Sequence, residues 1–116
     1  KTVPKRCLVA PPRAGGMIST RTFIPHSVHR SVGVLGAATV AVACLMPGTP
    51  VHGLAAIPKG KPRRCLIEHP GGMLEVEIDM EEGSEVRRTG IIRTARKLFD
   101  GTVFALEPED REGRKP

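Results

Sequence analysis

Residues 32–46 read VGVLGAATVAVACLM, an uncharged run of small and apolar side chains that decides which folds the chain can adopt. Apolar residues occupy every side of a helix drawn through this run, and such a helix is normally surrounded by the rest of the protein. We predict a helix from about His29 to Met46, with Ser27 or Ser31 capping its start and Pro47-Gly48 ending it. At about 1.5 Å per residue the run is too short to cross a bilayer, so we expect a buried helix and no membrane partner.

The chain after this helix alternates in the manner of a strand with one buried face. In residues 73–80, MLEVEIDM, every second side chain is apolar and those between them are mostly acidic. The turn at 82–84 then joins this strand to a hairpin partner at 86–93. The other predicted elements are strands at 3–10, 65–68 and 102–106, a strand or short helix at 18–24, and a helix at 94–99. The resulting fold class is α+β, with antiparallel strands about one buried helix.

Charge is distributed unevenly along the chain. Residues 1–67 hold ten of the basic residues and no acid, whereas all 12 acids lie between Glu68 and Glu112. A basic half suggests an anionic partner, either a small carboxylate or phosphate or a nucleic acid. The alternative is that the counter-charges lie on a segment outside this sequence, and Lys1 in place of an initiator Met suggests a chain cut from a longer one. The last residues, 107–116, are charged and flanked by Pro, so we predict a frayed tail.

The cysteines, Cys7, Cys44 and Cys65, are odd in number and far apart, which argues against a disulfide framework or a zinc site. Each lies in an apolar or strand-like run, so we predict three buried, reduced thiols. Reduced thiols suit a reducing compartment and no signal peptide is visible, so we expect a cytoplasmic protein. His26 and His29 are two potential metal ligands without a third, and we predict no metal.

Three stretches in order resemble the PrpF family. The first is Pro4-Lys5 followed by a strand and Pro11-Pro12. The second runs from Arg21 through His29-Arg30 and Gly36-Ala37 to Pro47-Gly48-Thr49, where the family has "HK…TGA" and "PGT". The third begins at Glu68-His69-Pro70 and Gly72, similar to "HPSG", and ends at 93–101, similar to the specific motif "RTARxLxxG". The resemblance covers nearly all of residues 3–106.

The family is similar in fold to diaminopimelate epimerase, in which two domains each wrap a barrel-like sheet around a central helix. The resemblance therefore implies that residues 1–106 are a partial C-terminal domain, and that the partner is the missing N-terminal domain of the same protein. The implied activity is isomerisation of an unsaturated di- or tricarboxylate without a cofactor, by removal and return of a proton. In relatives the acid and base, a Cys and a Lys, lie in the other domain, so no catalytic residue is assigned here and we expect the chain alone to be inactive.

A substrate carboxylate suits the free N–H groups at the start of the helix, roughly Val28 to Gly36. The resemblance and this argument together give the candidate substrate-binding residues, which are His29, Arg30, Ser31, Gly36 and His69. His69 before Pro70 is open to a second interpretation, as a residue that holds the geometry of a turn.

The sequence departs from the family where substrate contacts are expected. Ile24-Pro25-His26 replaces Ser-Met-Gly, Leu35-Gly36 replaces Thr-Gly, and Gly71 stands where relatives have Ser or Thr. Each change removes a hydroxyl or a permissive Gly, and a lost hydroxyl costs about 1 kcal/mol per bond to a bound carboxylate. The departures indicate either a different substrate or decayed activity.

Two functions follow from these residues. The first is part of a PrpF-type isomerase, for which 2-methylaconitate cis–trans isomerase and 4-oxalomesaconate tautomerase cannot be separated. The second is a non-catalytic basic module for an anionic partner such as nucleic acid, although the scarcity of aromatic residues argues against base stacking. A lone remnant of the domain would expose sheet edges and apolar surface, which predicts poor solubility or self-association.

Overall fold

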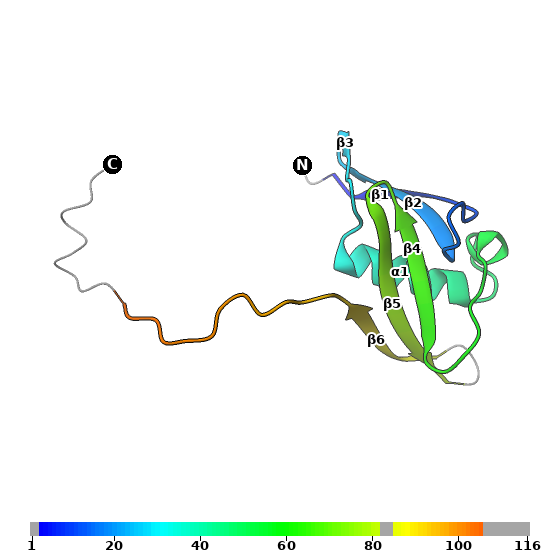
Figure 1. Ribbon diagram of the computed structural model, residues 1–116. Helices are drawn as coiled ribbons and strands as arrows, with labels where there is room; N and C mark the ends of the chain where they lie inside the picture. Colours follow the sequence, from blue (N-terminus) through cyan, green and yellow to red (C-terminus); the bar gives the residue numbers. More distant parts are fainter. Residues whose placement is uncertain (1–2, 82–84, 106–116) are drawn as a thin grey trace.

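The computed structural model describes residues 3–81 and 85–105, and its centre is a three-stranded meander (Figure 1). Strand β4 (Arg63–His69) turns through Pro70-Gly71 into β5 (Gly72–Met80), which pairs in turn with β6 (Val86–Ile92). Both pairs are antiparallel, which confirms the predicted hairpin.

Two strands from the basic half of the chain extend this sheet. Strand β1 (Arg6–Ala10) pairs antiparallel with β2 (Ile18–Ile24), so the segment left open between strand and short helix is a strand. The sheet order is β1-β2-β4-β5-β6, and the short β3 (Ser27–Val28) pairs with the end of β2.

The expectation of a wholly antiparallel sheet was wrong at one junction. Strands β2 and β4 run parallel, through the pairs Ile18 with Ile67 and Ser19 with Glu68. The helix lies in the connection between these two strands, and a helical crossover returns the chain to the sheet in its original direction. The sheet is therefore mixed.

The helix α1 (Val34–Leu45) starts about one turn later than predicted. Gly33 is its N-cap and makes no side-chain capping bond, so the prediction of Ser27 or Ser31 as cap was also wrong. The reason is that the preceding residues are held extended: β3 pairs with β2, and the His29 N–H donates to the Thr22 carbonyl oxygen at 2.8 Å.

The helix lies across one face of the sheet rather than inside a closed barrel (Figure 1). Its buried side chains face the sheet, and they are Ala37, Ala41, Cys44 and Leu45. On the other side Leu35 is 83% exposed. The prediction of a helix surrounded by strands therefore holds for one face only, because the described strands form a single open sheet.

The motif "PGT" closes the helix. Gly48 has a φ of +86°, which Gly adopts without strain. The Thr49 hydroxyl donates to the carbonyl oxygens of Ala43 and Met46, and the His52 Nδ1 lies 2.8 Å from the Cys44 carbonyl oxygen. These contacts satisfy carbonyl groups that have no partner within a helix.

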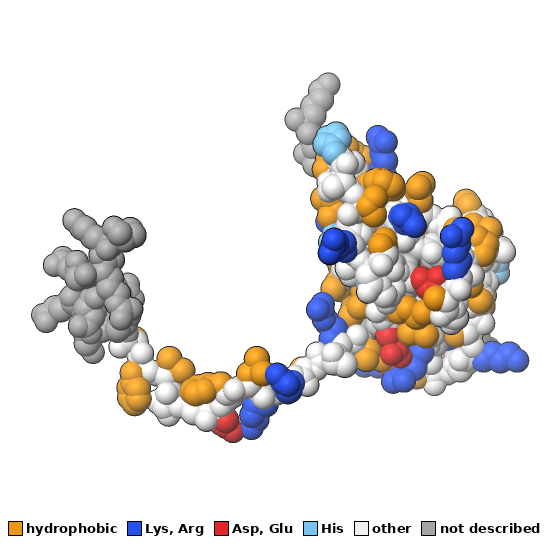
Figure 2. All heavy atoms as spheres, turned by 45° about the horizontal axis from the view of Figure 1, so that its top comes forward, with side chains coloured by type: hydrophobic (Ala, Val, Ile, Leu, Met, Phe, Trp, Pro, Cys, Tyr) orange, Lys and Arg blue, Asp and Glu red, His pale blue; other side chains and the backbone are white. Residues whose placement is uncertain are grey.

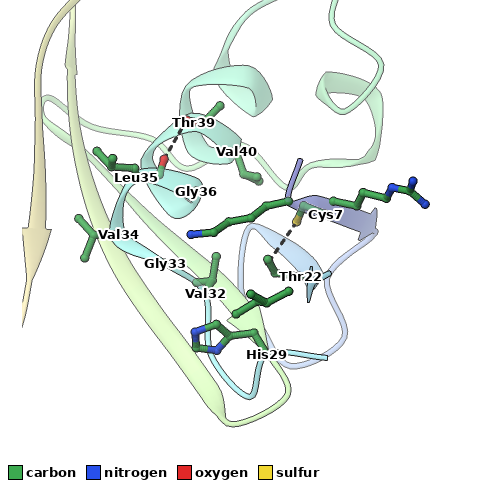
Figure 3. A pocket seen from close by; sticks show the side chains of 13 residues that line it. Cys7, Thr22, His29, Val32, Gly33, Val34, Leu35, Gly36, Thr39 and Val40 are labelled. Carbon is green, nitrogen blue, oxygen red and sulfur yellow. Dashed lines mark hydrogen bonds between the residues drawn. The ribbon is translucent and has the colours of Figure 1, made fainter. Parts of the chain in front are cut away.

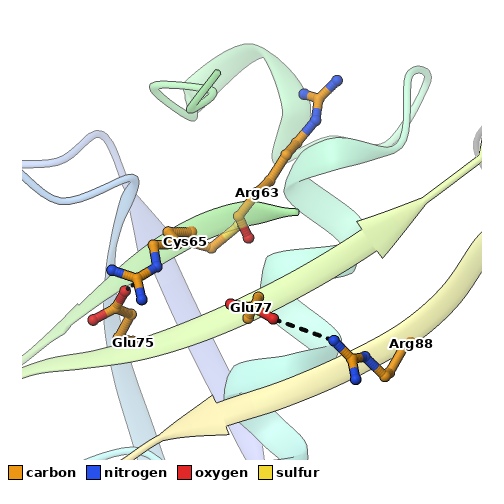
Figure 4. A network of polar contacts seen from close by, with 6 residues as sticks. Arg63, Cys65, Glu75, Glu77 and Arg88 are labelled. Atoms are coloured by element: carbon orange, nitrogen blue, oxygen red, sulfur yellow. Dashed lines mark hydrogen bonds and ion pairs between the residues drawn. The ribbon is translucent and has the colours of Figure 1, made fainter. Parts of the chain in front are cut away.

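The core lies between α1 and the sheet. Fully buried side chains from β2, β4 and β5 meet the small residues of the helix, and they are Ile18, Cys65, Ile67, Val76 and Ile78. The acidic side chains of β5 lie on the opposite face, as the alternation predicted. There Glu75 pairs with Arg64 at 3.3 Å and Glu77 with Arg88 at 3.5 Å (Figure 4).

The chain leaves the sheet after Ile92 as an extended arm, residues 93–105 (Figures 1 and 2). The predicted helix at 94–99 and strand at 102–105 do not form. A short helix needs an apolar face packed on the rest of the protein, and here the apolar side chains stay exposed. They are Leu98, Phe99, Val103 and Phe104. Residue 106 and the predicted tail at 107–116 lie outside the described residues.

Among the described residues, no helix combines the length and the apolar character that crossing a membrane requires.

Candidate functional site

A cavity of about 480 Å³ opens against the start of α1 (Figure 3). The first turn of the helix forms one wall, and β1, β2 and the segment before the helix form the others. The lining residues are Lys5, Arg6, Cys7, Thr22, Ile24, His29, Val32, Gly33, Val34, Leu35, Gly36, Thr39 and Val40.

The electrostatics of this cavity favour an anion. The Ala37 N–H makes the bond to the Gly33 carbonyl oxygen at 2.8 Å, so the N–H groups of residues 34–36 precede the first bond inside the helix. No acidic residue lies in this first turn. The basic residues Lys5 and Arg6 also line this cavity. Cys7 points toward Thr22 on the cavity side, so alternation along β1 places the Arg6 side chain on the other face. Lys5 is therefore the cation that adds to the partial positive charge of the helix end.

The rest of the lining is mainly hydrocarbon, from Ile24, Val32, Val34, Leu35 and Val40. Two of these, Ile24 and Leu35, are positions at which the sequence departs from the PrpF pattern. The other departures at this point, Pro25 and His26, form the turn between β2 and β3.

The structure divides the predicted substrate-binding residues between two adjoining cavities. His29 and Gly36 line the cavity at the helix start, whereas Ser31 and His69 line a neighbouring one of about 470 Å³. Val32 lines both cavities and so forms part of the wall between them. Arg30 lines neither, and its carbonyl oxygen lies 3.1 Å from the His69 Nδ1.

The prediction of three buried thiols is correct for two cysteines and wrong for Cys7. Cys44 and Cys65 are buried, and burial raises the pKa of each thiol to about 11. Both are therefore protonated at neutral pH and poor nucleophiles. Cys7 is exposed, because it lies on the edge strand β1, and its Sγ is 3.6 Å from the Thr22 hydroxyl that points toward it.

The most deeply buried charge in the described part of the chain, Glu68, carries no signal in the sequence pattern. The carboxylate of Glu68 is 5% exposed and accepts backbone N–H bonds of 2.7–3.1 Å from Arg13, Ala14 and Gly16. These bonds, that of Arg13 foremost, hold the pKa of the carboxyl group below its ordinary value against the opposing effect of burial. Glu68 fastens the loop after β1 to the sheet.

Metal ligands do not gather in the described part of the chain. Within residues 3–81 and 85–105, no group of three or more His, Cys, Asp or Glu side chains is placed to hold an ion.

A model of the PrpF protein family matches residues 1–106. The (4E)-oxalomesaconate Delta-isomerase of Novosphingobium is 48% identical over 104 residues, a match that covers 90% of this chain and 29% of the relative. The 4-oxalomesaconate tautomerase of Pseudomonas putida is 50% identical over 103 residues, covering 89% of this chain and 28% of the relative.

The fold is shared with a solved structure of a methylitaconate-delta-isomerase. The two match with a TM-score of 0.60 at 17% sequence identity, over 77% of this chain and 29% of that protein. The chain therefore spans less than a third of the length of the relatives that it matches.

Proposed function

Since this chain belongs to the PrpF family, we propose that it forms the carboxylate-holding part of an isomerase that moves a proton on an unsaturated di- or tricarboxylate. Two relatives that are 48% and 50% identical are named for oxalomesaconate, so oxalomesaconate is the substrate that we favour. The single observation that carries the proposal is the cavity at the start of α1, which the first turn of the helix and Lys5 both line.

The proposed reaction builds up negative charge on the substrate, and the site has to stabilise this charge. A base removes a proton from carbon next to an activating carboxylate, and an acid returns it at another position. Negative charge grows on the carboxylate oxygen atoms between these steps, and fixed N–H donors stabilise it without having to reorient. In this scheme the first turn of α1 supplies the donors, and Lys5 adds positive charge.

We place the acid and the base outside this chain, in the part of the relatives' length that it does not span. Cys44 and Cys65 are unsuited to proton transfer at neutral pH because burial holds their thiols protonated. We therefore propose that the chain binds substrate by itself but does not isomerise it.

Reversing the charge of Lys5 tests the binding role. In Lys5→Glu the cavity loses a cation and gains an anion, so we expect the affinity for cis-aconitate, an unsaturated tricarboxylate, to fall about tenfold. The measurement is an NMR titration of the ¹⁵N-labelled chain, followed at the backbone amides of Gly33 and Gly36. Lys59→Glu is the matched control, because Lys59 is exposed and outside the cavity. Equal weakening in both variants would mean that only net charge matters, and unmoved Gly33 and Gly36 amides in the wild type would remove the proposal.

A further inference from the structure

The segment that leads into α1 is held by a turn far away in the sequence. The His69 Nδ1, at the end of β4, lies 3.1 Å from the carbonyl oxygen of Arg30. The Gly71 backbone nitrogen, in the turn that follows, lies 3.2 Å from the same Nδ1. His29 comes just before this point, and Val32 and Gly33 come just after it, along the segment that forms a wall of the cavity (Figure 3).

Gly71 makes this approach possible. A Cβ atom built on Gly71 would lie 2.6 Å from the Arg30 carbonyl oxygen, closer than such atoms come in folded proteins. The obstacle is backbone rather than the end of a flexible side chain, so the segment at Arg30 would have to move to make room. The space that a serine would need at this position is thus taken by the chain leading into α1.

We propose that His69 and Gly71 are positioning residues, a latch that fixes residues 29–33 and through them the N–H groups at the start of α1. The functional consequence rests on the proposed carboxylate site, whereas the latch itself is a statement about backbone position. His69 then acts on the substrate through the wall of the cavity and does not touch it, in line with its second interpretation, as a residue that holds the geometry of a turn.

The two nitrogen atoms of the imidazole ring can be replaced separately, and this makes the latch testable. A ring nitrogen carries either a hydrogen atom or a lone pair, so Nδ1 serves one partner at a time. We assign the hydrogen to Nδ1, where it is donated to the Arg30 carbonyl oxygen. An asparagine amide places an N–H close to Nδ1, whereas a glutamine amide reaches toward Nε2. His69→Asn should therefore keep the latch and His69→Gln should lose it.

The experiment compares ¹⁵N-labelled chains of all 116 residues by NMR, first without and then with cis-aconitate. We expect the free-state amide signals of Ser31 and Gly33 to stay in place in His69→Asn and to move in His69→Gln and Gly71→Ala. Affinity for cis-aconitate should fall about tenfold in the last two variants and return to within about twofold of wild type in His69→Asn, because binding depends steeply on the placement of donors. Gly53→Ala is the matched control, since a Cβ atom there meets nothing within 4 Å.

The outcomes separate the latch from the proposed function. Free-state signals that move equally in His69→Asn and His69→Gln, or that stay in place in Gly71→Ala, would overturn the latch. Signals that move as expected while the wild type fails to bind cis-aconitate would leave the latch standing and remove the carboxylate site. If one His69 variant does not fold, Gly71→Ala tests the same contact from the other side.

Discussion

Replacing Glu68 by leucine is expected to lower the free energy of unfolding by about 4 kcal/mol, because buried N–H groups lose their acceptor at a cost of about 1–3 kcal/mol each. The carboxylate receives bonds from Arg13, Ala14 and Gly16, and the last of these is fully enclosed. Leucine has similar size but offers no acceptor, so residues 13–16 would lose their bonds to β4. Denaturation by urea, followed by circular dichroism, measures the change.

The same carboxylate gives a pH dependence with a definite sign. A carboxyl group whose pKa falls on folding adds stability above its unfolded pKa and loses that contribution as the pH falls through its folded pKa. Glu68→Gln does not titrate, so the stability difference between wild type and this variant should be full at pH 7 and shrink below about pH 4.5. Glu81→Gln, at an exposed ion pair with Arg87, is the control and should cost less than about 1 kcal/mol. A difference for Glu68→Gln that stays constant down to pH 3 would contradict this role.

The Ile67→Ala variant should lose about 3 kcal/mol of stability, since it removes three carbons from a fully enclosed site and leaves a cavity. Ile67 lies in the parallel pair of β2 and β4, and its partner on the neighbouring strand is Ile18. Both side chains belong to the core cluster. The same cluster also contains Ala37 and Ala41, whose small side chains cannot extend to fill the space.

The control for this substitution is Ile24→Ala, which makes the same chemical change at a side chain that is 39% exposed. We expect it to cost about 1 kcal/mol, clearly less than Ile67→Ala, because part of the removed surface already meets water and no enclosed cavity is left behind. Similar losses in the two variants would show that the core is not where the structure places it.

Local pattern was enough to predict several elements. The alternation of residues 73–80 specifies a strand with one buried face, and β5 buries Val76 and Ile78 while Glu77 remains on the other side. The same reasoning predicted the hairpin to β6. The end of the helix was predictable for a similar reason, because Pro47-Gly48 cannot continue it and Thr49 closes it through its own hydroxyl.

Other features depend on contacts between segments far apart in the sequence, and pattern does not reveal them. The late start of α1 follows from the pairing of β3 with β2, and the sequence pattern of neither strand predicts that pairing. Glu68 looks like an ordinary strand residue, and its role arises only when the loop at 13–16 folds over it. The candidate site was predictable at His29 and Gly36, which line the cavity, but Lys5 reaches it only through the pairing of β1 with β2.

The arm at 93–105 shows the opposite case, in which composition predicted structure that does not form. Residues 94–99 favour a helix by composition, yet no part of the described chain covers Leu98 or Phe99. Helices of this length depend on such cover.

The most direct test of the carboxylate-holding role is a chimera. Residues 3–105 of this chain replace the matching segment of the Novosphingobium (4E)-oxalomesaconate Delta-isomerase, to which the chain is 48% identical, and the isomerisation of oxalomesaconate is followed by its ultraviolet absorbance. We predict that the chimera isomerises oxalomesaconate and that Lys5→Glu within it lowers kcat/KM about tenfold, as expected for reversal of a charge beside a bound carboxylate. A folded chimera that leaves oxalomesaconate unchanged would contradict the carboxylate-holding role. A chimera whose kcat/KM is the same with Lys5→Glu as without it would contradict this role as well.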